Sequence, residues 1–155
     1  MQLYDYNLEF DELTPREVTD LIVIHHTGYP DGDASAAQIH DWHYGQGWVG
    51  IGYHWVIRKD GRLEFGRPEW AVGSHCYGFN HRSIGIHLSG CFDDVKPTAA
   101  QIETCAELIR DICDDYNIPL HRANVKGHCE LNETDCPGYY LYQKLDEILI
   151  MAQNL

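Results

Sequence analysis

The sequence predicts a single α/β domain with a central mixed β-sheet of about five strands, flanked by helices. Three observations point to this fold. A short apolar run, LIVI, ends in two histidines, an Asp-Gly turn joins two β-rich segments, and a long stretch after Thr98 has helical periodicity. The 155 residues are enough to bury one core, and no repeat or linker divides them, so we expect residues 1–155 to form one domain.

The first strand and the first helix are predicted from local signals. Residues 20–26 form a short apolar run, which is typical of a central strand covered on both faces. A loop containing glycine and proline follows. The pattern AAQIHDWHYGQG then favours a helix, with Asp33 or Ser35 as its N-cap and Gly45 or Gly47 at its end.

The middle of the chain is predicted to add further strands to the sheet. Residues 51–58 and 62–67 are rich in β-forming residues, and the turn between them contains Asp-Gly, which is a strong hairpin signal. Residues 83–89 read as another strand. A short strand is expected near Val125.

Two helices are predicted in the second half of the chain. Thr98 and Gln101 have the spacing of a capping box, and apolar residues recur at helical spacing from there to about Tyr116. The segment 127–138 reads as a long loop. A final helix is expected over residues 139–153.

Composition and charge exclude several classes of function. The formal net charge of −13 argues against nucleic acid as a partner, because phosphate binding requires clustered Lys and Arg. No run approaches about 20 consecutive apolar residues, so we expect no membrane insertion. The acidic N-terminal segment does not have the pattern of a secretory signal. We therefore expect a protein made in the cytosol of its producing cell, with its six cysteines serving as thiols or ligands.

Histidine and cysteine side chains suggest a metal site. His128 and Cys136 lie in the long loop GHCELNETDCPG, and His25 and His26 end the first strand. Two imidazoles and a thiolate form a zinc ligand set that leaves the fourth tetrahedral position open, as in catalytic sites. Open α/β sheets bind ligands at the carboxyl ends of their strands. The residues alone do not choose between His25 and His26, because the strand is apolar on both sides.

Four motifs, in order, resemble a known enzyme family. The segments IHHTG, VGIGYHWVIRKDG, WAVGSHCYGFNHRSIGI and GHCELNETDCPG are similar to those of the zinc-dependent N-acetylmuramoyl-L-alanine amidases of type 2. The likeness covers roughly residues 20–150 and is greatest to the small phage amidases, with peptidoglycan recognition proteins as more distant relatives. It implies the amidase type 2 fold. It also implies hydrolysis of the amide between the lactyl group of N-acetylmuramic acid and L-alanine of the peptidoglycan stem peptide.

The resemblance also implies roles for individual residues. His25, His128 and Cys136 match the positions that hold one zinc ion in the family. Tyr53 matches a tyrosine beside the zinc, where its hydroxyl donates to the oxyanion or orients water. Two residues before the zinc cysteine, phage relatives commonly carry lysine and many recognition-type amidases carry threonine. This chain has Thr134, which we expect to act as a second, uncharged donor.

The same resemblance suggests a substrate and alternative functions. His75 and Asn80 match the segment that lines the substrate groove, although both could instead stabilise their own loop. Peptidoglycan or muropeptides are the expected partners. We expect a phage or prophage endolysin that reaches the wall through lysis or a holin-type pore. The alternatives are an amidase that recycles wall fragments in the cytosol and a non-catalytic recognition module, against which Cys136 counts.

Overall fold

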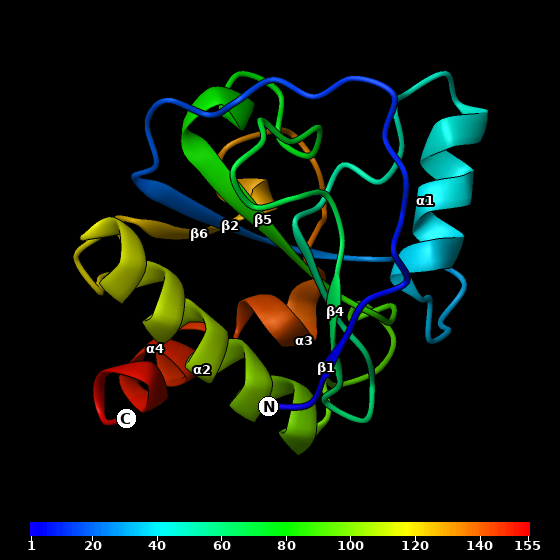
Figure 1. The fold of residues 1–155 in the computed structure, drawn as a ribbon. Coiled ribbons are helices and arrows are strands. Elements are labelled where there is room, and N and C mark those ends of the chain that lie inside the picture. Colours follow the sequence, from blue (N-terminus) through cyan, green and yellow to red (C-terminus); the bar gives the residue numbers. More distant parts are fainter.

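A six-stranded mixed sheet with the order β1-β4-β3-β5-β2-β6 forms the centre of the molecule (Figure 1). The computed structural model describes residues 1–155. The strands are β1 (Leu3–Tyr4), β2 (Leu21–His26), β3 (Trp55–Ile57), β4 (Leu63–Phe65), β5 (Ser83–Leu88) and β6 (Val125–Gly127). Only β3 and β4 pair antiparallel, as the hairpin signal predicted, and every other neighbouring pair is parallel.

Helices cover the sheet on both sides (Figure 1). They are α1 (Ala36–Gly45), α2 (Ala99–Tyr116), α3 (Tyr139–Tyr142) and α4 (Leu145–Gln153). The predicted capping box of Thr98 and Gln101 is present at the start of α2. None of the helices is long and apolar enough to cross a membrane.

Alternation along β2 assigns its side chains to two different clusters. Ile22 and Ile24 belong to the main core, a cluster of 21 buried residues that also includes side chains of α2 and α4. Leu21 and Val23 belong to a small cluster on the opposite face. Neighbouring strand residues point to opposite faces, so β2 is buried on both sides, as predicted.

Two local predictions were wrong in detail, and a third had left two residues open. The sheet has one more strand than expected, because exposed residues of β1 pair with β4, a contact distant in sequence. The final helix is two helices, α3 and α4, separated by a short break. Ser35, rather than Asp33, caps α1, and the Asp33 carboxylate instead accepts hydrogen bonds from Arg58 and from the Lys59 backbone.

Candidate metal and hydrolase site

The register of the sheet brings the predicted metal ligands together. β2 and β6 run parallel, and Ile24 lies opposite Gly127. The next residue along the chain is His25 on β2 and, directly after the end of β6, His128. Cys136 reaches the same edge from the loop that precedes α3. One donor atom from each of these three side chains lies within 4.8 Å of the other two.

The structure distinguishes His25 from His26. The His25 Nδ1 atom lies 3.6 Å from the Cys136 Sγ, on the site face of the sheet. The His26 ring lies on the other face, where its Nδ1 accepts a hydrogen bond of 3.1 Å from the Phe92 backbone N–H. The His26 backbone N–H nevertheless donates to the Cys136 Sγ at 3.4 Å, which favours a thiolate there.

The hydrogen bonds of the two histidines leave matching atoms free for a metal. The His25 Nε2 lies 2.9 Å from the His75 Nδ1, and the His128 Nε2 lies 2.8 Å from the Asn132 Oδ1. The His128 Nδ1 is buried and has no hydrogen-bond partner. Two imidazole nitrogens and one thiol form a donor set that suits zinc and leaves the fourth position for water or substrate. The residues present therefore fit the zinc ion that the resemblance implies.

Burial determines the protonation states of the three side chains. The pKa of His25 is held well below its usual value by burial and by the neighbouring His75 and His128, and burial also lowers the pKa of His128. Burial raises the pKa of the Cys136 thiol to about 12. At neutral pH both imidazoles are uncharged and have a free lone pair, whereas the thiol would release its proton to solvent only when a cation binds the sulfur.

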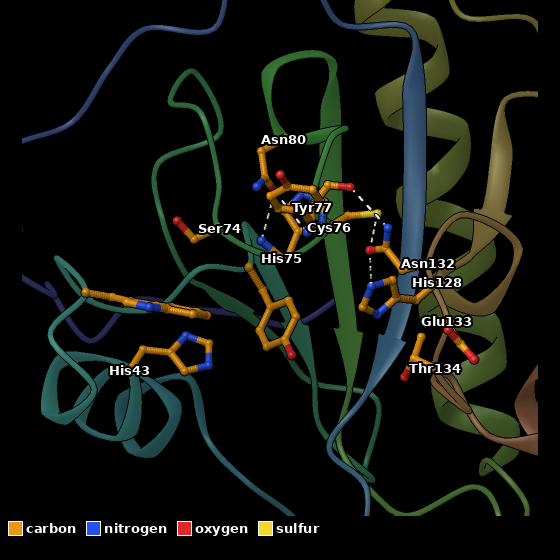
Figure 2. Close-up of a pocket in the computed structure, with 12 residues that line it drawn as sticks. His43, Ser74, His75, Cys76, Tyr77, Asn80, His128, Asn132, Glu133 and Thr134 are labelled. Atoms are coloured by element: carbon orange, nitrogen blue, oxygen red, sulfur yellow. Dashed lines mark hydrogen bonds between the residues drawn. The ribbon is translucent and has the colours of Figure 1, made fainter.

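A pocket of about 720 Å³ opens beside these residues. In Figure 2, His43 lies on one wall, His75 and Asn80 come from a second segment, and His128 and Thr134 lie on the opposite wall. Tyr53 also lines the pocket, and no lysine or arginine does so. The side chains that line this pocket therefore carry no permanent positive charge.

Tyr53 and Thr134 both line the pocket with hydroxyl groups that can donate. The Tyr53 ring centroid is 4.9 Å from that of His25, and no protein group bonds to its hydroxyl. Burial, followed by the nearby Cys136, raises the pKa of Tyr53, so the hydroxyl keeps its proton at neutral pH. The Thr134 Oγ1 accepts a 3.2 Å hydrogen bond from the Cys136 backbone N–H, and its own hydrogen remains available.

His75 lies directly behind His25 and uses both of its ring nitrogens within the protein. Its Nδ1 contacts His25, and its Nε2 lies 3.3 Å from the Ser83 Oγ. Gly85 on β5 makes room for the ring, because a Cβ there would lie 2.7 Å from the His75 Cγ. His75 therefore has no free ring nitrogen for substrate, and only its ring carbons can meet a ligand without breaking one of these contacts.

Asn80 organises the loop that carries His75. Its Oδ1 accepts hydrogen bonds of 2.9 Å from the backbone N–H groups of His75 and Cys76. Its side-chain nitrogen bonds to no protein group and is free to donate to a substrate carbonyl. Asn80 thus stabilises its own loop through its oxygen, and its nitrogen remains available for a ligand.

Among the pocket residues that sequence reasoning missed are His43 and Asn132. The His43 Nδ1 accepts from the Gly52 N–H at 2.9 Å, so the proton is on Nε2, and burial lowers the pKa of His43 to about 4. Asn132 contacts the ligand His128. No motif predicted either contact, because each depends on how separate loops meet.

The chain is similar in sequence and in fold to known N-acetylmuramoyl-L-alanine amidases. Residues 15–139 match the family model of the N-acetylmuramoyl-L-alanine amidases. The endolysin of Escherichia phage T7 is 38% identical over 132 residues, covering 81% of this chain and 85% of that protein. The amidase LysC from Clostridium intestinale URNW has a TM-score of 0.87 at 34% identity, covering 100% of this chain and 99% of that one.

A peptidoglycan recognition protein has the same fold. The structure of peptidoglycan recognition protein-LE, solved in complex with tracheal cytotoxin, has a TM-score of 0.77 at 30% identity and covers 88% of this chain and 85% of that one. The matched residues 15–139 include the segments that carry the site. The chain belongs to the type 2 N-acetylmuramoyl-L-alanine amidases, enzymes that hydrolyse an amide bond of peptidoglycan.

Proposed function

We propose that this chain cleaves the amide between the lactyl group of N-acetylmuramic acid and L-alanine, using one zinc ion held by His25, His128 and Cys136. The observation that carries the proposal is the convergence of these three donors within 4.8 Å, with the buried His128 Nδ1 lacking any protein partner. When bound, zinc supplies a Lewis acid that polarises the scissile carbonyl and activates water.

The chain itself supplies neutral donors for the charge that develops on the carbonyl oxygen. The Tyr53 hydroxyl keeps its proton and faces the pocket, and the Thr134 hydroxyl lies near the Cys136 backbone. Such preorganised donors stabilise an oxyanion strongly because they need no reorganisation during the reaction. Tyr53 and Thr134 are the proposed catalytic residues.

Asn80 and His75 have separate proposed roles. The free side-chain amide of Asn80 donates to a carbonyl of the muramyl group or stem peptide. His75 accepts the Nε2 proton of His25, which leaves the His25 Nδ1 lone pair directed at Cys136. A partner on the far nitrogen fixes both the tautomer and the orientation of a ligating histidine. His75 is thus proposed as a positioning residue that also lines the substrate pocket.

The likeness to phage endolysins supports a role in breaking the cell wall. On this proposal residues 1–155 act as one catalytic domain, which reaches peptidoglycan from the cytosol after lysis or through a holin-type pore. A non-catalytic recognition module does not need the oriented donor set of His25, His128 and Cys136. Recycling of soluble muropeptides uses the same chemistry and differs only in the substrate offered.

A digest of purified peptidoglycan tests the activity and the metal together. The protein is incubated with intact sacculi or with soluble muropeptides, with chelator and after zinc is restored, and the products are identified by mass spectrometry. We expect stem peptides with a free N-terminal L-alanine, lost with chelator and regained with zinc. Binding without release of these peptides would instead favour the recognition module.

A further inference from the structure

Asn132 joins the metal ligand His128 to the opposite wall of the pocket. Its Oδ1 lies 2.8 Å from the His128 Nε2 and accepts a weaker contact of 3.4 Å from the Cys76 thiol. Its side-chain nitrogen donates to the carbonyl oxygens of Tyr77, at 3.1 Å, and of Leu131, at 3.0 Å. Figure 2 shows Asn132 between His128 and the segment of Cys76 and Tyr77.

The partners of Asn132 determine which way its amide points. The carbonyl oxygens of Tyr77 and Leu131 can only accept, so the group that faces them must be the NH₂. The oxygen then faces His128. A carboxamide oxygen can only accept as well, so the proton of the neutral imidazole must be on the Nε2 of His128.

The position of this proton determines the state of the other ring nitrogen of His128, the Nδ1. With its proton on Nε2, His128 presents an unprotonated Nδ1, which is the buried atom without a protein partner beside His25 and Cys136. We propose that Asn132 is a positioning residue that holds His128 in the metal-binding tautomer and orientation.

Asn132 also fixes the relative position of two pocket walls. The bond to Tyr77 spans 55 residues of sequence and ties the loop between His128 and Cys136 to the segment that carries His75. His75 in turn contacts His25. The same amide therefore connects the surroundings of both ligating histidines. This inference rests on the proposed metal site, but it does not depend on which bond the enzyme hydrolyses.

Nitrogen NMR of the imidazoles in the full-length protein tests the proposal directly. In the chelator-treated wild type, the ¹⁵N shifts of His128 should show protonation at Nε2 alone. Protonation at Nδ1 would overturn the proposal before any variant is made. Retention of the fold after chelation is checked by circular dichroism on the same sample.

Two substitutions separate the contact of the Asn132 oxygen with His128 from the hydrogen bond of its side-chain nitrogen to Tyr77. Asn132→Leu removes every hydrogen bond, so His128 should populate both tautomers, and zinc affinity measured by chelator competition should fall about 10- to 100-fold. Asn132→Asp keeps an acceptor for the Nε2 proton but cannot donate to Tyr77. Its zinc affinity should therefore stay within about threefold of wild type, with the Nε2 tautomer retained.

Asn154→Leu is the matched control, because Asn154 is exposed and its side chain makes no hydrogen bond. It should leave tautomer and affinity unchanged. Wild-type affinity with a single Nε2 tautomer in Asn132→Leu would contradict the proposal, as would a large loss of affinity in Asn132→Asp. If Asn132→Leu fails to fold, the zinc affinity of Asn132→Asp and the His128 tautomer of the wild type still test the proposal. None of these readouts depends on amidase activity, so an inactive enzyme that binds zinc as predicted would refute only the proposed reaction.

Discussion

The two faces of the sheet are stabilised in different ways. One face packs Ile and Leu side chains of β2 and β5 against α2 and α4 in the main core. The other presents Ser83, Gly85 and His87 on β5 beside His25 on β2, and its buried polar groups are held largely by hydrogen bonds. Apolar burial is non-directional and tolerates repacking, whereas a buried polar group depends on particular partners.

Arg67 shows how far the site face relies on polar contacts. Its guanidinium is buried and donates to the backbone oxygens of Gly50, Ile51 and Val72 and to the Ser74 hydroxyl, without a carboxylate partner. These bonds position both the segment that leads to Tyr53 and the segment that leads to His75. The comparison therefore predicts that substitutions on the site face impair chemistry, while those on the core face impair stability.

Cys136→Ser should give the largest effect and leave the fold intact. Loss of a ligand removes several kcal/mol of transition-state stabilisation, so amidase activity should fall at least about 10³-fold. Cys129→Ser is the control, since Cys129 is outside the donor set. Turnover and zinc content are measured beside thermal unfolding. Retention of normal turnover by Cys136→Ser would remove this residue from the site.

Ile109→Ala should instead destabilise the fold through the core face of the sheet. Ile109 is fully buried in the main core, so the free energy of unfolding should fall by about 2–5 kcal/mol in urea titrations. Zinc affinity of the folded protein should not change. Ile150→Ala, at an exposed position on α4, should cost less than about 0.5 kcal/mol. Equal losses for the two variants would argue against the packing described for this face.

Tyr53→Phe separates catalysis from metal binding on the site face. Removing one oxyanion donor should lower kcat about 10²-fold, with zinc affinity and unfolding nearly unchanged. Tyr29→Phe, which changes a tyrosine that is 88% exposed, is the control. A Tyr53→Phe enzyme with wild-type kcat would show that this hydroxyl has no catalytic role.

The core face could be predicted from sequence much better than the site face. The cap and periodicity of α2 are local signals, and so is the Asp60-Gly61 turn of the hairpin. The break between α3 and α4 has no glycine or proline to mark it, and β1 exists only because β4 lies beside it. Propensity and pattern describe neighbours in sequence, so they do not reveal contacts of this kind.

For the site, sequence supplied candidate residues but not their contacts. The motifs pointed to His25, His128 and Cys136, and the register of β2 with β6 explains why they meet. The bond between His75 and His25 and the bond between Asn132 and His128 were not foreseen. Both link separate loops, and hydrogen bonds to ring nitrogens have no spacing rule in sequence.

The pH dependence of stability should also distinguish the two faces. The His54 Nδ1 accepts from the Gly85 N–H, and its Nε2 lies 2.8 Å from the Ala71 carbonyl oxygen, an arrangement that requires the neutral ring. Burial lowers the pKa of His54 to about 3 from 6.5, so unfolding takes up a proton below pH 6.5. This contribution to stability is complete above pH 6.5 and is lost as the pH falls towards 3.

We therefore expect the free energy of unfolding to decrease below pH 6.5 by up to about 1.4 kcal/mol per pH unit for each such histidine. Burial likewise lowers the pKa of His87 to about 3. Urea titrations between pH 7.5 and 5 measure the slope, and His54→Gln should reduce it. A free energy of unfolding that stays constant or increases as the pH falls from 7.5 to 5 would contradict the assignment of neutral, buried histidines.

The central claim is that His25, His128 and Cys136 hold one zinc ion at the polar edge of the sheet. X-ray absorption spectroscopy of the zinc-loaded protein tests it most directly. We expect one zinc per chain, with a single sulfur at about 2.3 Å and nitrogen ligands at about 2.0–2.1 Å, and loss of the sulfur signal in Cys136→Ser. A site with no sulfur or with several sulfurs, or a sulfur that persists in Cys136→Ser, would contradict it.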